Sequence, residues 1–165
     1  MTKEEAINLV IKNKDSFVWL DESFRANKKI ALLAMKKNGA QLRYVSDNLK
    51  NDYDVVLLAV GNSVLALAEA SEEMRKNREI VKAAINHDIR SLSVAHLSFK
   101  ESKELAVLAL SKNPKDVKYF SQEIQDICGD SDQVNRLLKA IASENLSKSL
   151  SASLGDKSEN PKKKI

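Results

Sequence analysis

The sequence predicts an all-α fold, an α-solenoid of about five 25-residue helix-helix-turn repeats with a C-terminal helical cap. The first observation behind this prediction is a column of apolar residues at that spacing, formed by Phe17, Leu42, Leu67, Leu92 and Val117. Two further apolar columns, which start at Leu20 and Phe24, keep the same register through five copies without an insertion. The second observation is that residues able to cap helices recur at fixed positions in every copy. Chance cannot reasonably produce five such copies, so the period predicts the architecture before any single motif is considered.

The composition is that of a chain with a substantial hydrophobic core. Its 165 residues are 43% hydrophobic and 30% charged, which is enough to bury a core without disulfides or metals. A single cysteine, Cys128, excludes an internal disulfide and is compatible with a reducing compartment. The longest aliphatic run, from Val55 to Val60, is six residues, whereas a membrane span needs about 20. Residues 1–5 are acidic where a signal peptide is basic, so we expect a soluble cytoplasmic protein, with export by other signals left open.

Each repeat is expected to begin with a helix of about ten residues. The residues that precede these helices all have side chains that can accept a hydrogen bond from the free N–H groups of a first turn. They are Thr2, Asn27, Asp52, Asn77 and Ser102. Thr2 and Glu5 also have the spacing of a capping box, so the first helix is predicted to start at the next residue after Thr2.

A second, shorter helix and a returning turn complete each repeat. The predicted caps of the second helix are Asn13, Asn38, Ser63, Asp88 and Asn113. The predicted caps of the helical turn are Asp21, Ser46, Ser71, His96 and Ser121. The predicted repeats therefore span residues 2–26, 27–51, 52–76, 77–101 and 102–126, within one domain over residues 1–154.

Small residues within the repeats are interpreted by their columns. Gly39 shares its column with Val64, Ile89 and Pro114, which do not tolerate positive φ. We therefore expect Gly39 to be an ordinary residue of a first turn. A column of alanines is expected where helices approach closely, at Ala34, Ala59, Ala84 and Ala109.

The ends of the array are expected to differ from its middle. Glu5 and Asn8 occupy core columns in the first repeat, which is the polar outer face expected of a terminal repeat. At the other end, residues 127–130 are predicted to break the register, with Cys128 in an irregular and accessible segment. Residues 130–154 are predicted to form the C-terminal helical cap, and residues 155–165 a disordered polar tail.

Particular segments carry a resemblance to a known family. LKNDYDVVLLAV at residues 49–60, ASEEMRKNREIV at 70–81, and KKNG at 36–39 are similar to the bacterial family catalogued as domain of unknown function 4116. The resemblance covers residues 28–125 and is clearest between 28 and 85. It implies an all-helical repeat unit, found in bacteria that include intracellular pathogens whose secreted effectors contain such modules. It implies no catalytic residues.

Groups that could carry chemistry are sparse, and most have a structural interpretation. His87 is expected to be exposed at a helix C-terminus, and His96 to make a local hydrogen bond. Neither histidine is spaced with Cys128 as zinc ligands are, so no metal site and no cofactor are predicted. Carboxylates such as Asp54 and Glu104 lie in predicted first turns, where they complement the helix dipole.

One column differs from both core and ordinary surface. It lies two residues after the Phe17 column and holds the only tryptophan and two of the three tyrosines. We name it the aromatic stripe: Trp19, Tyr44, Glu69, Val94 and Tyr119. Basic residues flank it at Arg43, Arg90, Lys115 and Lys118. Such rings suit a recognition surface, and they equally suit lids over the joints between repeats, so both interpretations stay open.

The sequence favours a non-enzymatic protein–protein interaction scaffold that binds a protein partner through the second helices. In a pathogen it would be a small effector, translocated into a host cell, or a regulator of another effector or host protein. Two alternatives remain: an enzyme with an unrecognised acidic or Cys128-dependent site, and weak nucleic-acid binding. The net charge of +4 includes +2 from the tail, which leaves too few cations for a dense phosphate-binding surface. The partner and the oligomeric state are not predicted.

Overall fold

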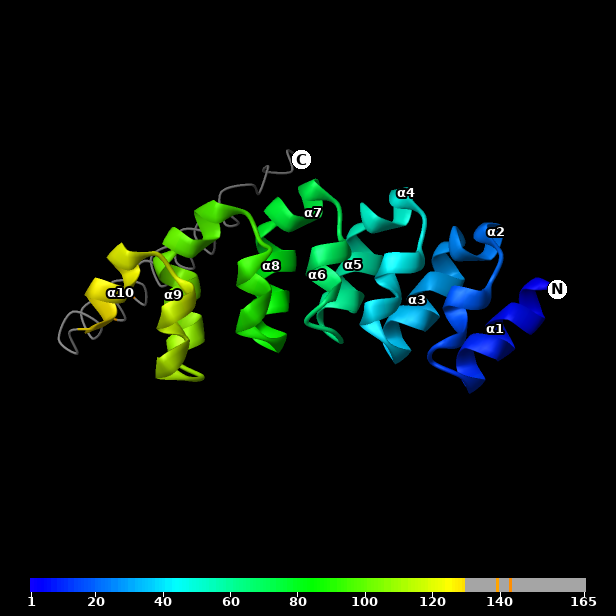
Figure 1. Cartoon of the computed structure of the whole chain (residues 1–165), viewed down its shortest axis with the longest axis horizontal. Coiled ribbons are helices and arrows are strands. Elements are labelled where there is room, and N and C mark those ends of the chain that lie inside the picture. Colours follow the sequence, from blue (N-terminus) through cyan, green and yellow to red (C-terminus); the bar gives the residue numbers. More distant parts are fainter. Residues whose placement is uncertain (130–138, 140–142, 144–165) are drawn as a thin grey trace, which may run out of the picture.

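The structure of the chain is a computed structural model that describes residues 1–129 together with Lys139 and Ser143. Every regular element in that part of the chain is helical (Figure 1). Apart from Lys139 and Ser143, the predicted cap at residues 130–154 and the predicted tail at 155–165 lie outside the described residues. Across the described residues no helix is both long enough and apolar enough to cross a membrane.

Each 25-residue period contains three helical segments. The longest is an α-helix: α1 (Lys3–Lys12), α3 (Lys28–Lys37), α5 (Tyr53–Val60), α8 (Arg78–His87) and α9 (Lys103–Leu110). The second is short: η1 (Ser16–Trp19), η2 (Gly39–Tyr44), α6 (Ala66–Glu69), η3 (Ile89–Ser93) and η5 (Pro114–Tyr119). The third segments are α2 (Glu22–Arg25), α4 (Asp47–Lys50), α7 (Glu72–Lys76), η4 (Leu97–Glu101) and α10 (Gln122–Gly129). The first four of them return the chain to the next long helix.

Side-chain caps start the long helices where the sequence predicted them. Each capping side chain accepts a hydrogen bond from the backbone N–H three residues on, and Thr2 with Glu5 forms the predicted capping box. The caps predicted for the second helices bond instead to the N–H two residues on, as Asn38 does with Ala40 at 3.1 Å. This tighter turn leads into a 3-10 helix in four of the five repeats.

The caps of the third segments are confirmed only in part. Ser71 accepts a hydrogen bond from the Met74 N–H at 3.2 Å, and His96 accepts one from the Ser98 N–H at 3.4 Å. Asp21 and Ser46 precede their helices but make no capping hydrogen bond through the side chain.

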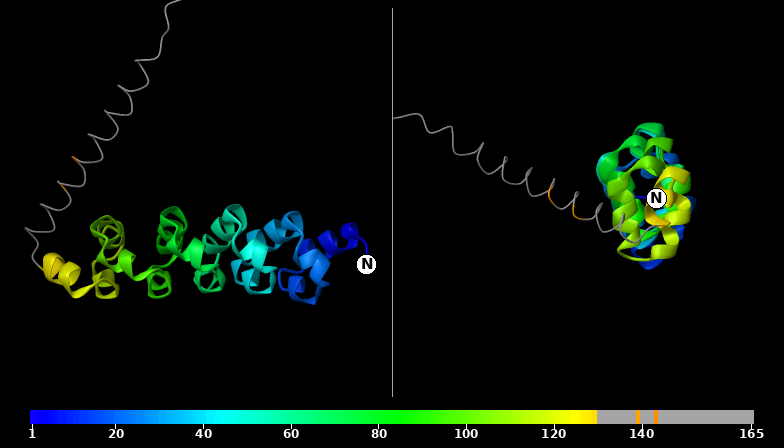
Figure 2. Two further views of the ribbon diagram at one scale, coloured as in Figure 1. Left: turned by 90° about the horizontal axis from the view of Figure 1, so that it is seen from above. Right: turned by 90° about the vertical axis from the view of Figure 1, so that its left-hand side faces the viewer.

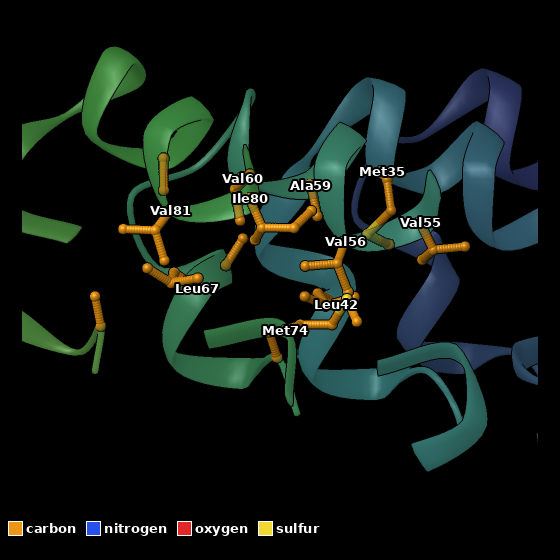
Figure 3. Packing of buried hydrophobic residues seen from close by; sticks show 14 of the residues in the cluster. Met35, Leu42, Val55, Val56, Ala59, Val60, Leu67, Met74, Ile80 and Val81 are labelled. Carbon is orange, nitrogen blue, oxygen red and sulfur yellow. The ribbon is translucent and has the colours of Figure 1, made fainter. Parts of the chain in front are cut away.

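The long helices follow one another in chain order along the molecule (Figure 2). α1 packs on α3, α3 on α5, α5 on α8, and α8 on α9. Their buried side chains join those of the shorter segments in one continuous hydrophobic cluster that runs from Ala6 to Ile124. Figure 3 shows part of this cluster, where Met35, Val56 and Ile80 come from three successive long helices. The predicted alanine column is at most 2% exposed, so a small residue is needed where the helices pack together.

Backbone hydrogen bonds join the third segments of successive repeats. The Ser71 N–H donates to the Lys50 carbonyl at 3.0 Å, and the Ser121 N–H donates to the Lys100 carbonyl at 3.0 Å. His96 makes the equivalent bond to the Arg75 carbonyl at 3.3 Å. Between the first two repeats, the Arg25 guanidinium instead donates to the Tyr44 carbonyl at 3.3 Å. These bonds hold neighbouring repeats in a constant register.

Ion pairs join the N-terminal turns of neighbouring long helices. Lys28 Nζ lies 2.9 Å from a carboxylate oxygen of Asp52 and 2.7 Å from one of Asp54, and Arg78 pairs with Glu104. The side chains of these pairs are partly exposed, from 23% for Asp52 to 65% for Asp54, so they contribute much less to stability than the buried cluster does.

The sequence predicted a polar outer face for the first repeat, and Glu5 and Asn8 are exposed on α1. Two apolar side chains of α1, Leu9 and Ile11, are exposed as well. The outer face of α1 is therefore mixed in character.

The structure corrects the prediction for Gly39. Its φ is not positive, as expected, but it is not an ordinary position. A Cβ atom added there would lie 2.1 Å from the carbonyl oxygen of Ala59 and 3.1 Å from the Cβ of Ser63. Glycine is required because η2 lies directly against the C-terminal end of α5.

The predicted break in register is confirmed, because α10 continues past residue 127, where the period would place the cap of a further long helix. The prediction that this segment is irregular is wrong. Helix α10 runs through Cys128 and ends at Gly129. Cys128 is partly buried and packs against the hydrophobic cluster, so it does not lie in an irregular, accessible segment.

We expect Gly39→Ala to destabilise the fold by about 1–3 kcal/mol, because the added methyl group must push η2 away from α5. Gly61→Ala is the matched control. A Cβ at Gly61 would meet only the Leu57 and Leu58 carbonyl oxygens, at 3.5 and 3.7 Å, and its backbone is already helical. This control should be neutral or stabilising by about 0.4–1 kcal/mol. Urea unfolding of the three proteins, followed by circular dichroism, measures both effects, and equal midpoints for the two variants would contradict the assignment of Gly39.

Candidate functional site

The second helices and the residues leading into them carry the predicted site. These segments span residues 14–19, 39–44, 64–69, 89–94 and 114–119, and we call the side chains among them that reach solvent the second-helix face. η1 packs on η2, η2 on α6, and η3 on η5, whereas α6 and η3 do not pack closely on each other. All four predicted basic residues, Arg43, Arg90, Lys115 and Lys118, are exposed on it.

The aromatic stripe divides into one exposed ring and two half-buried rings. Trp19, at the end of η1, is 81% exposed, which is unusual for so large an apolar side chain. Tyr44, Val94 and Tyr119 are partly buried and pack against the hydrophobic cluster. Glu69 is half-buried at the end of α6. The two tyrosines therefore cover the core and still present an edge to solvent, whereas Trp19 covers little.

Cations lie over both tyrosine rings. The guanidinium carbon of Arg43 is 5.4 Å from the centroid of the Tyr44 ring, and Lys118 Nζ is 5.1 Å from the centroid of Tyr119. In both pairs the cation belongs to the residue that directly precedes the tyrosine in the sequence. These cation–π contacts restrict both side chains, which lowers the entropy that a partner's binding would cost.

Arg90 is held by a carboxylate from its own turn. Arg90 Nε donates to both oxygens of Asp88 at 3.0 Å, and Nη2 donates at 2.5 Å. These hydrogen bonds hold the pKa of Asp88 below its usual value, against the opposing effect of burial. The same contact raises the pKa of Arg90, with a smaller contribution from Tyr119. Asp88 thus caps η3 and also orients a cation on the second-helix face.

A cavity that the sequence did not predict opens on the same face between α6 and η3. Its volume is about 240 Å³, and its lining is largely apolar: Val64, Leu65, Ala68, Arg90, Ser93 and Val94. Leu65 is 63% exposed. The one sequence signal that pointed here is the column of Leu65, which elsewhere holds Asp15, Ala40, Arg90 and Lys115.

A second cavity of about 240 Å³ lies at the C-terminal ends of α8 and α9, and its lining mixes apolar side chains with the charged Asp88, Lys112 and Asp116. Lys112 Nζ donates to the Asn86 carbonyl at 2.5 Å, and Asp116 accepts a hydrogen bond from Asn113 at 3.1 Å. His87, which the sequence placed on the surface, is exposed at the end of α8 and lines this cavity. Within the described residues, no group of three or more His, Cys, Asp or Glu side chains could hold a metal ion.

His96 and Cys128 both have a structural explanation. The Nδ1 atom of His96 lies 2.8 Å from Ser98 Oγ, which confirms the predicted local hydrogen bond. Burial raises the pKa of the Cys128 thiol, so the neutral thiol is favoured over the nucleophilic thiolate.

A family model described as a domain of unknown function (DUF4116) matches the chain over residues 3–50, 27–75 and 77–125. Each match spans close to two of the 25-residue periods, as expected for a repeated unit. The matches reach further toward residue 1 than the resemblance over residues 28–125 that the sequence motifs carried. No curated protein and no solved structure matches the chain.

The Asp88–Arg90 pair predicts a specific pH dependence of stability. Because the pKa of Asp88 is lower in the folded chain, its charge stabilises the fold above the unfolded pKa of about 3.9. This contribution is lost as the pH falls through the folded pKa. Asp88→Asn keeps an oxygen for the Arg90 N–H but cannot titrate, so its unfolding free energy should fall less steeply with acid than that of the unchanged protein.

Arg90→Gln provides the control. Removing the guanidinium should raise the pKa of Asp88 toward its ordinary value, which NMR titration of the Asp88 carboxyl carbon measures directly. An unchanged titration midpoint in Arg90→Gln would show that Arg90 does not determine the ionisation of Asp88.

Proposed function

Because the chain belongs to the family described as a domain of unknown function (DUF4116), we propose its function from its own surface: a non-enzymatic scaffold that binds a protein partner through the second-helix face. The observation that carries this proposal is Trp19, which is 81% exposed on the first repeat's part of the second-helix face. An exposed tryptophan contributes little to folding, and tryptophan is enriched among residues that dominate binding energy at interfaces.

The proposed architecture is an α-solenoid, in which the stacked repeats form an extended surface. The chain-order packing of α1, α3, α5, α8 and α9 supports it, as do the bonds between third segments at constant sequence separation. A solenoid places equivalent residues of neighbouring repeats in a row. A partner lying along the array would therefore meet Trp19, Tyr44 and Tyr119 in succession.

The tyrosines suit the same role. Tyr44 and Tyr119 are already anchored against the core and covered by Arg43 and Lys118, so few rotamers remain to be lost when a partner binds. Aromatic and arginine side chains supply most of the binding energy at many protein interfaces. The exposed cations would add electrostatic complementarity at the rim of such an interface.

The biological setting belongs to the same proposal. A protein of this kind in a bacterium would act in the cytoplasm, and in a pathogen it would act as a small effector or as a regulator of another effector or host protein. A scaffold that only binds can serve either role, because its output depends on which proteins it brings together.

Affinity capture from native or host cells, with the full chain as bait and mass spectrometry as readout, identifies the partner for the decisive test. The combined variant Trp19→Ala, Tyr44→Ala, Tyr119→Ala should then weaken its affinity by about a hundredfold or more, because each ring is expected to contribute at least about 1 kcal/mol. Isothermal titration calorimetry with the purified partner measures the change.

The control removes as many exposed apolar side chains from other elements: Ile11→Ala, Tyr53→Ala and Leu97→Ala. This variant should bind the partner as tightly as the unchanged protein. Since Tyr44 and Tyr119 also touch the core, the pair Arg43→Glu and Lys118→Glu tests the same face without removing a ring. Full affinity in both face variants, with circular dichroism showing them folded, would contradict the proposal.

A further inference from the structure

We propose that the cavity between α6 and η3 is a docking site for an acidic peptide segment, which inserts one large apolar side chain beside Val94 and places a carboxylate on Arg90. The site lies on the second-helix face, so this inference rests on the proposed function and specifies the chemistry of the partner. The occupant is a segment of another protein, and its two recognition elements are an apolar anchor and a neighbouring Asp or Glu.

The apolar half of the site comes from two neighbouring repeats. Val64, Leu65 and Ala68 lie on or just before α6, and Val94 follows η3. α6 and η3 pack less closely on each other than η2 does on α6 or η3 on η5, which leaves the cavity between them. Its volume of about 240 Å³ is sufficient for one large aliphatic or aromatic side chain. Leu65, 63% exposed at the edge of the cavity, would lose its contact with water when the anchor enters.

The polar half of the site is Arg90. Asp88 engages Nε and Nη2, so the plane of the guanidinium is already oriented. Nη1 makes no hydrogen bond within the described residues, and the Arg90 side chain is 66% exposed. A carboxylate of the peptide could therefore accept a charge-assisted hydrogen bond from Arg90 while the anchor occupies the apolar half.

The charge of the surrounding face favours an acidic occupant. Its charged residues comprise five cations and three carboxylates: Lys14, Asp15, Arg43, Glu69, Arg90, Lys115, Asp116 and Lys118. Asp88 adds a fourth carboxylate, but it is paired with Arg90. With Asp88 counted, the cations exceed the carboxylates by one, and Arg90 is the only charged residue among those that line the cavity. An acidic segment would be attracted to this face, whereas a basic one would be repelled at the anchor point.

A displayed library of random peptides, selected on the full chain, tests the inference without a known partner. We expect the enriched peptides to share a large apolar residue next to Asp or Glu. Fluorescence anisotropy with the labelled synthetic peptide then measures its affinity for variants of Ala68, which is exposed on α6 and lines the cavity. Ala68→Glu should weaken binding by about tenfold or more, because its carboxylate repels the peptide.

Ala68→Lys is the matched control, since it adds a side chain of similar length with the opposite charge. The Ala68→Lys variant should bind the peptide about tenfold more tightly than the Ala68→Glu variant does. In the peptide, Ser in place of the apolar anchor should abolish binding, and Arg90→Gln should weaken it. Selection of basic or uncharged peptides, or equal affinities for Ala68→Glu and Ala68→Lys, would overturn the inference.

The outcomes separate this inference from the proposed function. A captured partner that needs Trp19, Tyr44 and Tyr119, together with no acidic peptide that depends on Ala68 and Arg90, would leave the scaffold proposal standing and reject the cavity. The opposite outcome is that acidic peptides bind at the cavity while a captured partner tolerates the ring and charge variants of the second-helix face. That outcome would support the cavity and reject the scaffold proposal.

Discussion

No repeat of this chain can bury both of its apolar faces alone, so every repeat depends on the helices packed against it. The buried alanines at 34, 59, 84 and 109 and the glycine at 39 show how tight that packing is. At Gly39 there is no room even for a methyl group between η2 and the end of α5. The continuous core from Ala6 to Ile124 follows from this packing. The partly exposed ion pairs between long helices add only a minor contribution.

The same constraint explains the character of the second-helix face. The long helices use their apolar positions for packing against one another, and the third segments use backbone groups to join successive repeats. The second helices are short, and their outward positions take part in neither interaction. Trp19 therefore contributes little to the core, whereas Tyr44 and Tyr119 cover part of it. Within the described residues, the flanking cations Arg43, Lys118 and Arg90 contact only groups of the second helices and their caps. A binding surface can change at such positions without loss of the fold.

The two cavities, each of about 240 Å³, differ in the chemistry that they offer. The cavity at the ends of α8 and α9 is lined by His87, Asp88, Lys112 and Asp116, and Lys112 already satisfies the last turn of α8 through Asn86. Lys112, Asp88 and Asp116 in this cavity therefore already have hydrogen-bond partners within the fold. The cavity between α6 and η3 combines apolar side chains with one oriented guanidinium, which is the pairing of anchor and polar contact that binding sites use for recognition.

The sequence by itself determined the helical repeat, the starts of the long helices and the aromatic stripe. These features depend on spacing along the chain: a cap such as Asn77 bonds to a backbone group three residues away, and a column of equivalent residues repeats with the period. Only the tertiary structure decided the requirement for Gly39, the helical position of Cys128 and the cavity beside Arg90. Each of these depends on how closely two segments from different parts of the chain approach, and neighbouring repeats with the same pattern pack at slightly different separations. Junctions between repeats are not equivalent, so Gly39 meets the end of α5 although Val64 and Ile89 hold the same place in the period, and the period gives no sign of the gap between α6 and η3.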